Sequence, residues 1–137
     1  VRNVRGADWY NDSIATAPER TLAALLSFQS PVILLLGGRD KNLPWEKLAK
    51  HVRSRVRHVI LFGEAAELIS SALGSVQPNQ TLQSISRCAS LQEAVQKAAE
   101  LAQEGDSVLL SPGGTSYDAF KDFEERGECF RQWVNAL

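Results

Sequence analysis

Three short apolar runs, each followed by glycine, constrain the fold of this 137-residue chain more than any other feature of its sequence. They are residues 32–36 before Gly37-Gly38, residues 59–62 before Gly63, and residues 108–110 before Ser111-Pro112-Gly113-Gly114. Continuous apolar runs of this length, bounded by glycine, are typical of strands buried on both faces. We therefore expect a sheet covered on both sides, with weaker strands around Trp9 and Tyr10 and at residues 82–85.

Stretches with the apolar spacing of a helix separate these strands. Thr16-Ala-Pro-Glu19 has the pattern of a capping box, in which the side chain of Thr16 caps the helix and Glu19 is its third residue. The helix that follows is expected to bury Leu22, Leu25 and Leu26.

A second capping box, Ser90-Leu-Gln-Glu93, opens another predicted helix. Helical spacing also covers residues 45–56, 65–72 and 120–137. The alternation of strands and helices predicts the α/β class, namely a Rossmann-like three-layer domain with a mostly parallel sheet and helices on both faces.

Length and charge narrow the classes of protein and partner. A chain of 137 residues has the size of one domain, so we expect residues 1–137 to form a single one. The 15 basic and 16 acidic residues leave no basic footprint for nucleic acid. The apolar runs are far shorter than the about 20 residues that cross a bilayer, and no secretory signal is visible, so no membrane partner is expected. The sequence contains no methionine, even at its first position, which indicates a piece of a longer protein.

Cysteine and histidine do not indicate a metal site. Cys88 and Cys129 are far apart in the sequence, and we expect two partly buried free thiols. His51 and His58 border a basic stretch with no carboxylate or cysteine beside them, so a surface role is favoured.

The polar segments that follow three predicted strands are the candidates for ligand binding, because ligands bind to such sheets where the strands end. In residues 11–16, Asp12, Ser13 and Thr16 lie close to a predicted helix start, where backbone N–H groups and the helix dipole favour an anion. The alternative is that Thr16 only caps the helix and Asp12 only forms the turn.

The other two segments have the same two interpretations. Residues 37–41 pair glycines with Lys41, a point charge for a carboxylate or phosphate, or else form a tight turn with a solvated lysine. Residues 111–118 offer hydroxyls and backbone amides, or else form a serine- and glycine-rich loop capped by Ser116. Together the three segments predict a domain that binds a small anionic molecule.

Several enzyme classes are disfavoured by what the segments lack. The P-loop pattern G-x-x-x-x-G-K-[ST] and the dinucleotide pattern G-x-G-x-x-G are both absent from the sequence. Neither histidine belongs to the three segments, which argues against nucleophilic catalysis, and we predict no catalytic residue within the chain.

Read in order, these segments resemble the C-terminal domain of the Mur ligases, and in particular the branch of that family that adds D-glutamate. The resemblance runs from about Val4 to the end of the chain. It is carried by Asn-Asp-Ser-Ile-Ala-Thr (residues 11–16) with Pro18, Gly-Gly-Arg-Asp-Lys (37–41), Leu-Leu-Ser-Pro (109–112) and Ser-Tyr-Asp-Ala-Phe-Lys-Asp-Phe-Glu-Glu-Arg-Gly-Glu-Cys-Phe (116–130).

The resemblance implies one part of a three-domain, ATP-dependent ligase of the bacterial cytoplasm. The implied substrates are D-glutamate and UDP-N-acetylmuramoyl-L-alanine, which the enzyme joins during peptidoglycan precursor synthesis. ATP and Mg²⁺ are the implied cofactors, bound mainly by a central ATPase domain of the same polypeptide. That domain and the N-terminal domain are absent from this sequence, so the chain alone is expected to be inactive.

The resemblance also implies the residues of the site. Asp12 would contact the ATP ribose. The residues expected to bind D-glutamate are Thr16, Lys41, Ser116, Tyr117 (through its backbone) and Phe123. The chain departs from the family at Ile14, where many members have lysine, at residues 113–115, where many have Ala-Cys-Ala, and at Tyr117, where a smaller apolar residue or phenylalanine is common.

Two other functions stay open. The chain is also consistent with the equivalent domain of a relative that adds another amino acid or adds glutamyl groups to folate. It is also consistent with a stand-alone Rossmann-like module that binds an acidic metabolite.

Overall fold

In the part of the chain that the structure describes, six strands form one mixed sheet in the order β1-β2-β6-β3-β4-β5. The structure, a computed structural model, describes residues 1–29 and 31–137. β1 pairs antiparallel with β2, and every other neighbouring pair of strands is parallel. The strands are β1 (Arg2–Val4), β2 (Ala7–Asn11), β3 (Val32–Gly37), β4 (Val56–Phe62), β5 (Ser84–Arg87) and β6 (Ser107–Gly113).

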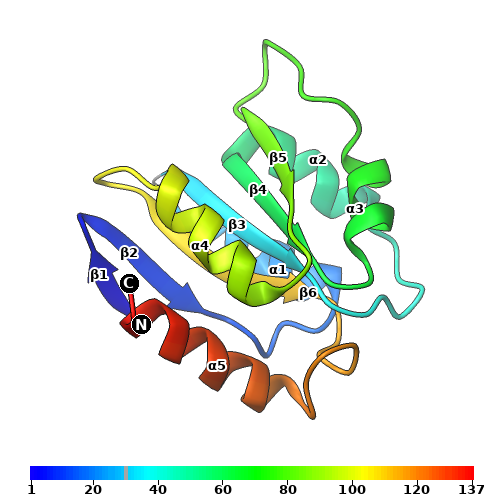
Figure 1. Ribbon diagram of the computed structural model, residues 1–137. Coiled ribbons are helices and arrows are strands. Elements are labelled where there is room, and N and C mark those ends of the chain that lie inside the picture. Colours follow the sequence, from blue (N-terminus) through cyan, green and yellow to red (C-terminus); the bar gives the residue numbers. More distant parts are fainter. Residues whose placement is uncertain (30) are drawn as a thin grey trace.

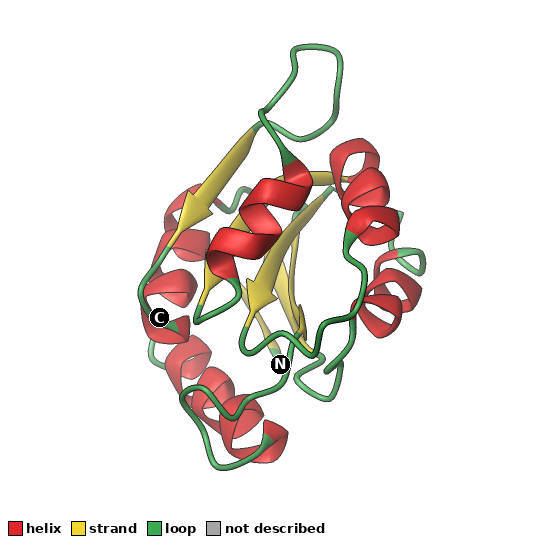
Figure 2. Cartoon of the chain, turned by 90° about the vertical axis from the view of Figure 1, so that its right-hand side faces the viewer, coloured by secondary structure: helices red, strands yellow, loops and turns green. Residues whose placement is uncertain are grey.

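Among the described residues, five helices cover the two faces of the sheet (Figures 1 and 2). They are α1 (Pro18–Leu25), α2 (Glu46–Arg55), α3 (Ala66–Leu73), α4 (Leu91–Leu101) and α5 (Phe123–Asn135). Leu34 and Leu36 of β3 pack with residues of α1, α2 and α3, whereas Ile33 and Leu35 pack with residues of α4 and α5. Because successive side chains of a strand point to opposite faces, β3 supplies both layers of the core. The predicted Rossmann-like, mostly parallel fold is confirmed.

The start of α1 differs from the prediction. Ala17, not Thr16, is the N-cap residue, it has extended backbone angles, and no side chain caps this helix. Proline is favoured at the first helical position, so Pro18 sets the start one residue later than a capping box at Thr16 would require. The helix also ends at Leu25, which leaves Leu26 45% exposed rather than buried. The second capping box is confirmed, because Ser90 Oγ accepts a 3.2 Å hydrogen bond from the backbone N–H of Glu93.

Other predicted boundaries shift by a few residues. Val56 matches the spacing of α2 but is the first residue of β4, because the helix passes directly into the strand. Phe120 precedes α5, which begins at Phe123 after the N-cap Asp122. The predicted strand at residues 82–85 lies two residues later, as β5.

The structure confirms the prediction for the two cysteines but not the one for His58. Cys88 and Cys129 are free and half-buried, as expected. The surface role predicted for His58 is wrong: this residue is buried in β4, and its Nδ1 lies 2.6 Å from Ser84 Oγ of the neighbouring strand β5.

No helix in the described part of the chain is both long enough and apolar enough to cross a lipid bilayer.

Candidate functional site

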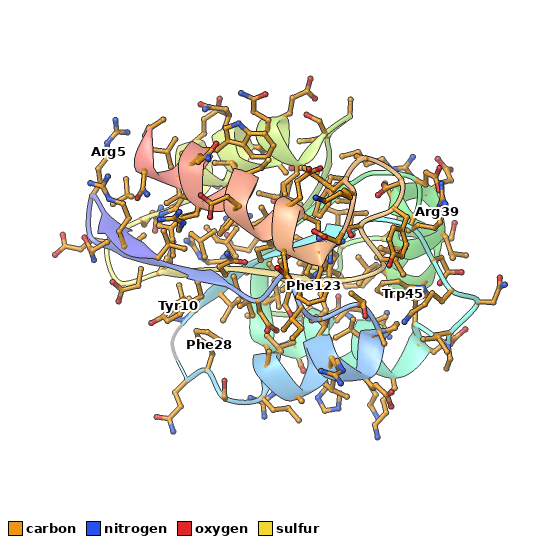
Figure 3. All side chains as sticks on the ribbon, turned by 90° about the horizontal axis from the view of Figure 1, so that it is seen from below. Arg5, Tyr10, Phe28, Arg39, Trp45 and Phe123 are labelled. Atoms are coloured by element: carbon orange, nitrogen blue, oxygen red, sulfur yellow. The ribbon has the colours of Figure 1, made fainter. Side chains whose placement is uncertain are left out.

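The three segments singled out in the sequence follow neighbouring strands of the sheet. They are residues 12–17 after β2, residues 114–122 after β6 and residues 38–45 after β3, and the strand order places β6 between the other two. Figure 3 shows Arg39 and Trp45 at this end of the molecule, away from Arg5 at the opposite end. The expectation that the three segments share one edge of the sheet is confirmed.

Backbone hydrogen bonds join these segments to one another. The N–H of Arg39 donates to the carbonyl of Thr115 at 2.9 Å, and the N–H of Thr115 donates back to Arg39 at 2.8 Å. The N–H of Gly113 donates to the carbonyl of Ala15 at 2.9 Å. The edge is therefore one connected surface rather than three independent loops.

Glycine permits this close approach. Gly38 has a φ of +97°, and a Cβ at this position would lie 2.3 Å from the carbonyl oxygen of Thr115. A Cβ on Gly114 would lie 2.6 Å from the carbonyl oxygen of Gly37. Backbone thus already occupies the space beside these glycines, and they allow the loops, rather than a ligand, to approach.

Asp12 is held in one orientation by β6. Its Oδ2 accepts a 2.7 Å hydrogen bond from the hydroxyl of Ser111. The carbonyl of Ser111 in turn accepts a 2.9 Å bond from Thr21 Oγ1 of α1. A half-buried carboxylate therefore lies at the start of the loop after β2. Its other oxygen, Oδ1, takes no part in the hydrogen bond with Ser111.

Four of the residues expected to bind D-glutamate lie on the three loops. Thr16 is half-buried just before α1, and its hydroxyl does not cap that helix. Lys41 is exposed and belongs to none of the ion pairs found within residues 1–29 and 31–137. Ser116 is 2% exposed, whereas the neighbouring Tyr117 is 64% exposed.

Phe123, the last of these residues, is half-buried at the start of α5 (Figure 3). It lines a cavity of about 310 Å³ together with Asn11, Ser13, Ile14 and Gly127. The lining of this cavity does not include Thr16, Lys41 or Ser116. The structure thus places the three polar residues on adjoining loops without joining their side chains.

Side-chain hydrogen bonds hold the loop that carries Lys41, both within the loop and to the segment after β4. Asp40 accepts hydrogen bonds of 3.0 Å from the indole N–H of Trp45 and from the backbone N–H of Asn42. Arg39 donates two hydrogen bonds, of 2.9 and 3.2 Å, to the carboxylate of Glu64. This hydrogen-bonded guanidinium lowers the pKa of Glu64 below its usual value.

Sequence reasoning missed Arg126, which is fully buried on α5 beneath the site. Its Nε and Nη2 donate to the hydroxyl and the carbonyl of Ser13, at 3.0 and 2.7 Å, and its Nη1 donates to the carbonyl of Gly114 at 3.0 Å. Burial lowers its pKa to about 10, so the side chain stays protonated near neutral pH. A sequence signal existed: Arg126 stands three residues after Phe123 and four before Phe130, on the apolar face of the helix.

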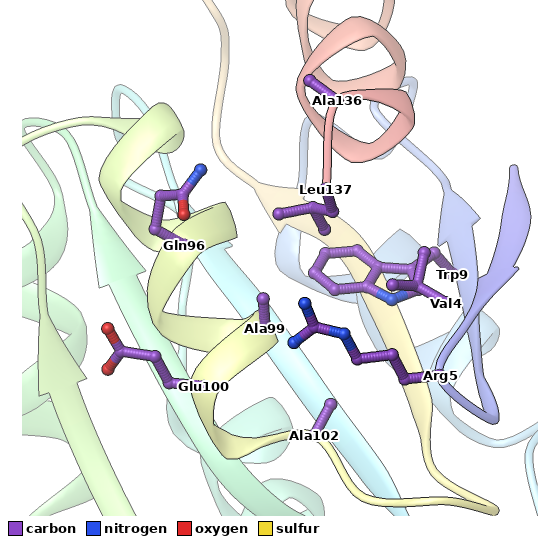
Figure 4. A pocket seen from close by; sticks show the side chains of 9 residues that line it. All are labelled: Val4, Arg5, Trp9, Gln96, Ala99, Glu100, Ala102, Ala136 and Leu137. Atoms are coloured by element: carbon purple, nitrogen blue, oxygen red, sulfur yellow. The ribbon is translucent and has the colours of Figure 1, made fainter.

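Another cavity, of about 330 Å³, lies apart from this edge (Figure 4). Val4, Arg5 and Trp9 line it from the β1–β2 hairpin, and Glu100 and Leu137 line it from the other side. It includes none of the residues that the sequence singled out for binding. Within the described residues, no three histidine, cysteine, aspartate or glutamate side chains gather as a metal site.

Comparison with known proteins gives consistent matches. The family model described as "Mur ligase, glutamate ligase domain" matches residues 1–114. The chain is 40%, 42% and 44% identical to proteins named UDP-N-acetylmuramoylalanine--D-glutamate ligase from Ruminiclostridium cellulolyticum, Acetivibrio thermocellus and Clostridium tetani. Each match covers 100% of this chain but only 30% of the relative.

Solved structures show the same fold. A structure of UDP-N-acetylmuramoyl-L-alanyl-D-glutamate--2,6-diaminopimelate ligase matches 99% of this chain and 30% of its own, with a TM-score of 0.64 and 19% identity. The MurF ligase of Thermotoga maritima, solved in complex with ADP, matches 99% of this chain and 30% of its own, with a TM-score of 0.52 and 16% identity. At these identities the likeness concerns the fold alone.

Proposed function

The chain belongs to the Mur ligase family through its glutamate ligase domain, and we propose that it is the C-terminal domain of the ATP-dependent ligase that joins D-glutamate to UDP-N-acetylmuramoyl-L-alanine. One observation carries this proposal: relatives named as D-glutamate ligases match the whole chain at 40–44% identity. The chain spans about 30% of the length of these relatives, so the proposed reaction belongs to a longer polypeptide. In it, residues 1–137 would form one domain that follows a central ATPase domain.

The proposed task of this domain is to hold D-glutamate. A substrate with two carboxylates needs a cation and oriented hydrogen-bond donors, because desolvating its charges is otherwise costly. Lys41 supplies the cation, the hydroxyls of Thr16 and Ser116 supply donors, and the backbone of Tyr117 and the ring of Phe123 complete the pocket. The adjoining positions of the loops after β2, β3 and β6 support this assignment.

ATP with Mg²⁺ is the proposed cofactor, and the residues of this chain fit only a small part of it. The carboxylate of Asp12 suits the hydroxyls of the ATP ribose, and Ser111 holds it in place. The sequence lacks a P-loop, and the described residues contain no carboxylate cluster for a metal ion. The phosphates and the metal are therefore assigned to the central domain, where phosphoryl transfer would activate the carboxylate of the precursor.

Positioning is the contribution of this chain to the proposed reaction. The amine of D-glutamate must meet the activated carboxylate of the precursor, and holding it there is worth several kcal/mol of barrier in well-oriented systems. Because the nucleotide-linked precursor and ATP are made inside the cell, we assign the reaction to the bacterial cytoplasm.

A substrate panel on the full-length protein tests the proposal. With UDP-N-acetylmuramoyl-L-alanine present, ATP hydrolysis is expected to depend on D-glutamate and not on L-glutamate, L-lysine or diaminopimelate. Preference for another amino acid would assign the chain to a different ligase of the family. A reading frame that begins directly before Val1, with no upstream P-loop, would favour a stand-alone module that binds an acidic metabolite.

The 137-residue chain serves as the matched control in that assay. Because it lacks a P-loop, it is expected to form no amide with ATP, D-glutamate and the precursor. ATP-dependent amide formation by this chain alone would contradict the assignment of the ATP phosphates and the metal to the central domain.

A further inference from the structure

We propose that Arg126 is a positioning residue of this site: it fixes the loop after β2 relative to the loop after β6, so that Thr16 and Ser116 bind the same carboxylate-bearing substrate. The inference rests on the function proposed above, because it concerns the same edge of the sheet. It assigns Arg126 a role through the two loops rather than a contact with the substrate.

Within residues 1–29 and 31–137, the side-chain hydrogen bonds of Arg126 reach these two loops alone. Two of its nitrogens hold Ser13, at 2.7 and 3.0 Å, and the third holds the carbonyl of Gly114 at 3.0 Å. Ser13 lies three residues before Thr16, and Gly114 lies two residues before Ser116. The planar guanidinium, held on α5, thus sets the spacing between the two loops.

A further hydrogen bond ties this arrangement to α5. The hydroxyl of Ser13 accepts from Arg126 and donates to the carbonyl of Phe123 at 2.7 Å. The first loop is therefore attached to the helix at two points, and Phe123 is itself one of the residues proposed to line the substrate pocket. A change in the position of Arg126 would move the loop after β2, the loop after β6 and the start of α5 together.

The burial of this charge is not explained by packing alone. Arg126 is 0% exposed, and its hydrogen-bond partners are two carbonyls and a hydroxyl rather than a carboxylate. An unpaired buried cation is costly, and an apolar side chain would fill the same space at less cost. Asp118 interacts with it through its charge, but the two form none of the ion pairs found among the described residues. A fixed positive charge behind two loops favours a negatively charged ligand in front of them.

Two substitutions separate the shape of the guanidinium from its charge. Arg126→Lys keeps the positive charge but cannot span Ser13 and Gly114, because the ammonium group is a single point on a flexible chain. Arg126→Met removes both the charge and the hydrogen bonds. Arg131→Lys and Arg131→Met are the matched controls, since Arg131 lies on the same helix but is exposed and paired with Glu128.

Steady-state kinetics of the full-length protein provide the first readout. Arg126→Lys is expected to raise the KM for D-glutamate roughly 10- to 100-fold, the size of effect that a misplaced site produces. The KM for ATP should change much less, because Ser111 and the backbone of Leu110 hold Asp12 independently of Arg126. The Arg131 variants should keep both KM values.

Hydrogen exchange of the same full-length variants provides a readout without catalysis. Arg126→Lys should lose protection at the amides of residues 13–16 and 113–116, and the Arg131 variants should not. If the wild-type protein shows no turnover with D-glutamate, the proposed function fails, and the exchange data alone decide the role of Arg126. Should Arg126→Met not fold, Arg126→Lys still decides. A lysine variant that is less stable but keeps the wild-type KM and the protection of both loops would overturn the proposal.

Discussion

The hydroxyl of Ser111 donates a 2.7 Å hydrogen bond to the carboxylate of Asp12, although 99 positions separate the two residues. Ser111 is fully buried in β6, and Asp12 begins the loop after β2. Hydrogen bonds to charged groups contribute about 1.5–3 kcal/mol. Ser111→Ala is therefore expected to lower the free energy of unfolding of the 137-residue chain by about that amount, measured by urea denaturation.

Ser54→Ala is the control for this variant. Ser54 is exposed, and its hydroxyl donates only to the carbonyl of His51 within the same helix. Its replacement should change the free energy of unfolding by less than about 0.5 kcal/mol. Under the proposed function, Ser111→Ala should also raise the KM for ATP in the full-length protein. Equal stabilities for the two variants would show that the contact between Ser111 and Asp12 has no net energetic value.

A second prediction concerns the close approach of the loops after β3 and β6. Gly38→Ala places a methyl group at a φ of +97° and 2.3 Å from the carbonyl oxygen of Thr115. Strain and overpacking together should lower the free energy of unfolding by about 3 kcal/mol or more. Urea denaturation of the chain measures this change.

Gly105→Ala isolates the contribution of backbone strain. Gly105 has a φ of +90°, but a Cβ there would meet nothing within 4 Å. Its replacement is expected to lower the free energy of unfolding by only about 1 kcal/mol. A loss as small at Gly38 would mean that the loops can separate easily, which would weaken the description of a connected surface.

Features set by local sequence could be predicted, whereas features set by distant contacts could not. The apolar run of β3 is buried along its whole length, and Ser90 caps α4 as its motif indicates. At α1 two local signals compete, and Pro18 determines the helix start instead of Thr16. Val56 satisfies the spacing of a helix and the preference of a strand equally, so periodicity alone could not place it.

The candidate site follows the same division. The strand order placed the three predicted segments at one edge, because parallel strands end on the same side of a sheet. Arg126 bonds to Ser13, 113 positions away, and no spacing within α5 identifies that partner. The contact of His58 with Ser84 likewise joins two different strands. Side chains that connect distant segments become recognisable only when the fold brings those segments together.

A third prediction concerns pH. Burial, and next to it the neighbouring charge of Arg57, lower the pKa of His58 below the usual 6.5, while Asp106 opposes them. The unfolded chain therefore takes up this proton at a higher pH than the folded chain does. The contribution of this pKa difference to the free energy of unfolding is fully present above pH 6.5. It is lost as the pH falls from there through the lower pKa of the folded state.

His58→Gln tests this contribution, because glutamine does not titrate and still offers a hydrogen bond to Ser84. Urea denaturation between about pH 8 and pH 5 should show a steeper loss of stability for the wild-type chain than for the variant. Parallel profiles would indicate that His58 takes up its proton equally in the folded and unfolded states.

The last prediction concerns Lys41, whose exposed ammonium group has no ion-pair partner within the described residues. Under the proposed function it pairs with a carboxylate of D-glutamate, and a charge-assisted bond of this kind is worth about 1.5–3 kcal/mol. Lys41→Ala in the full-length protein should therefore raise the KM for D-glutamate roughly 10- to 100-fold, and the KM for ATP far less. Lys50→Ala, which removes an exposed lysine from α2, is the control and should change neither value. Stability should be unaffected in both variants, because neither side chain is buried. Wild-type kinetics for D-glutamate in Lys41→Ala would remove this residue from the site and leave the hydroxyls of Thr16 and Ser116 without the cation that a dianionic substrate requires.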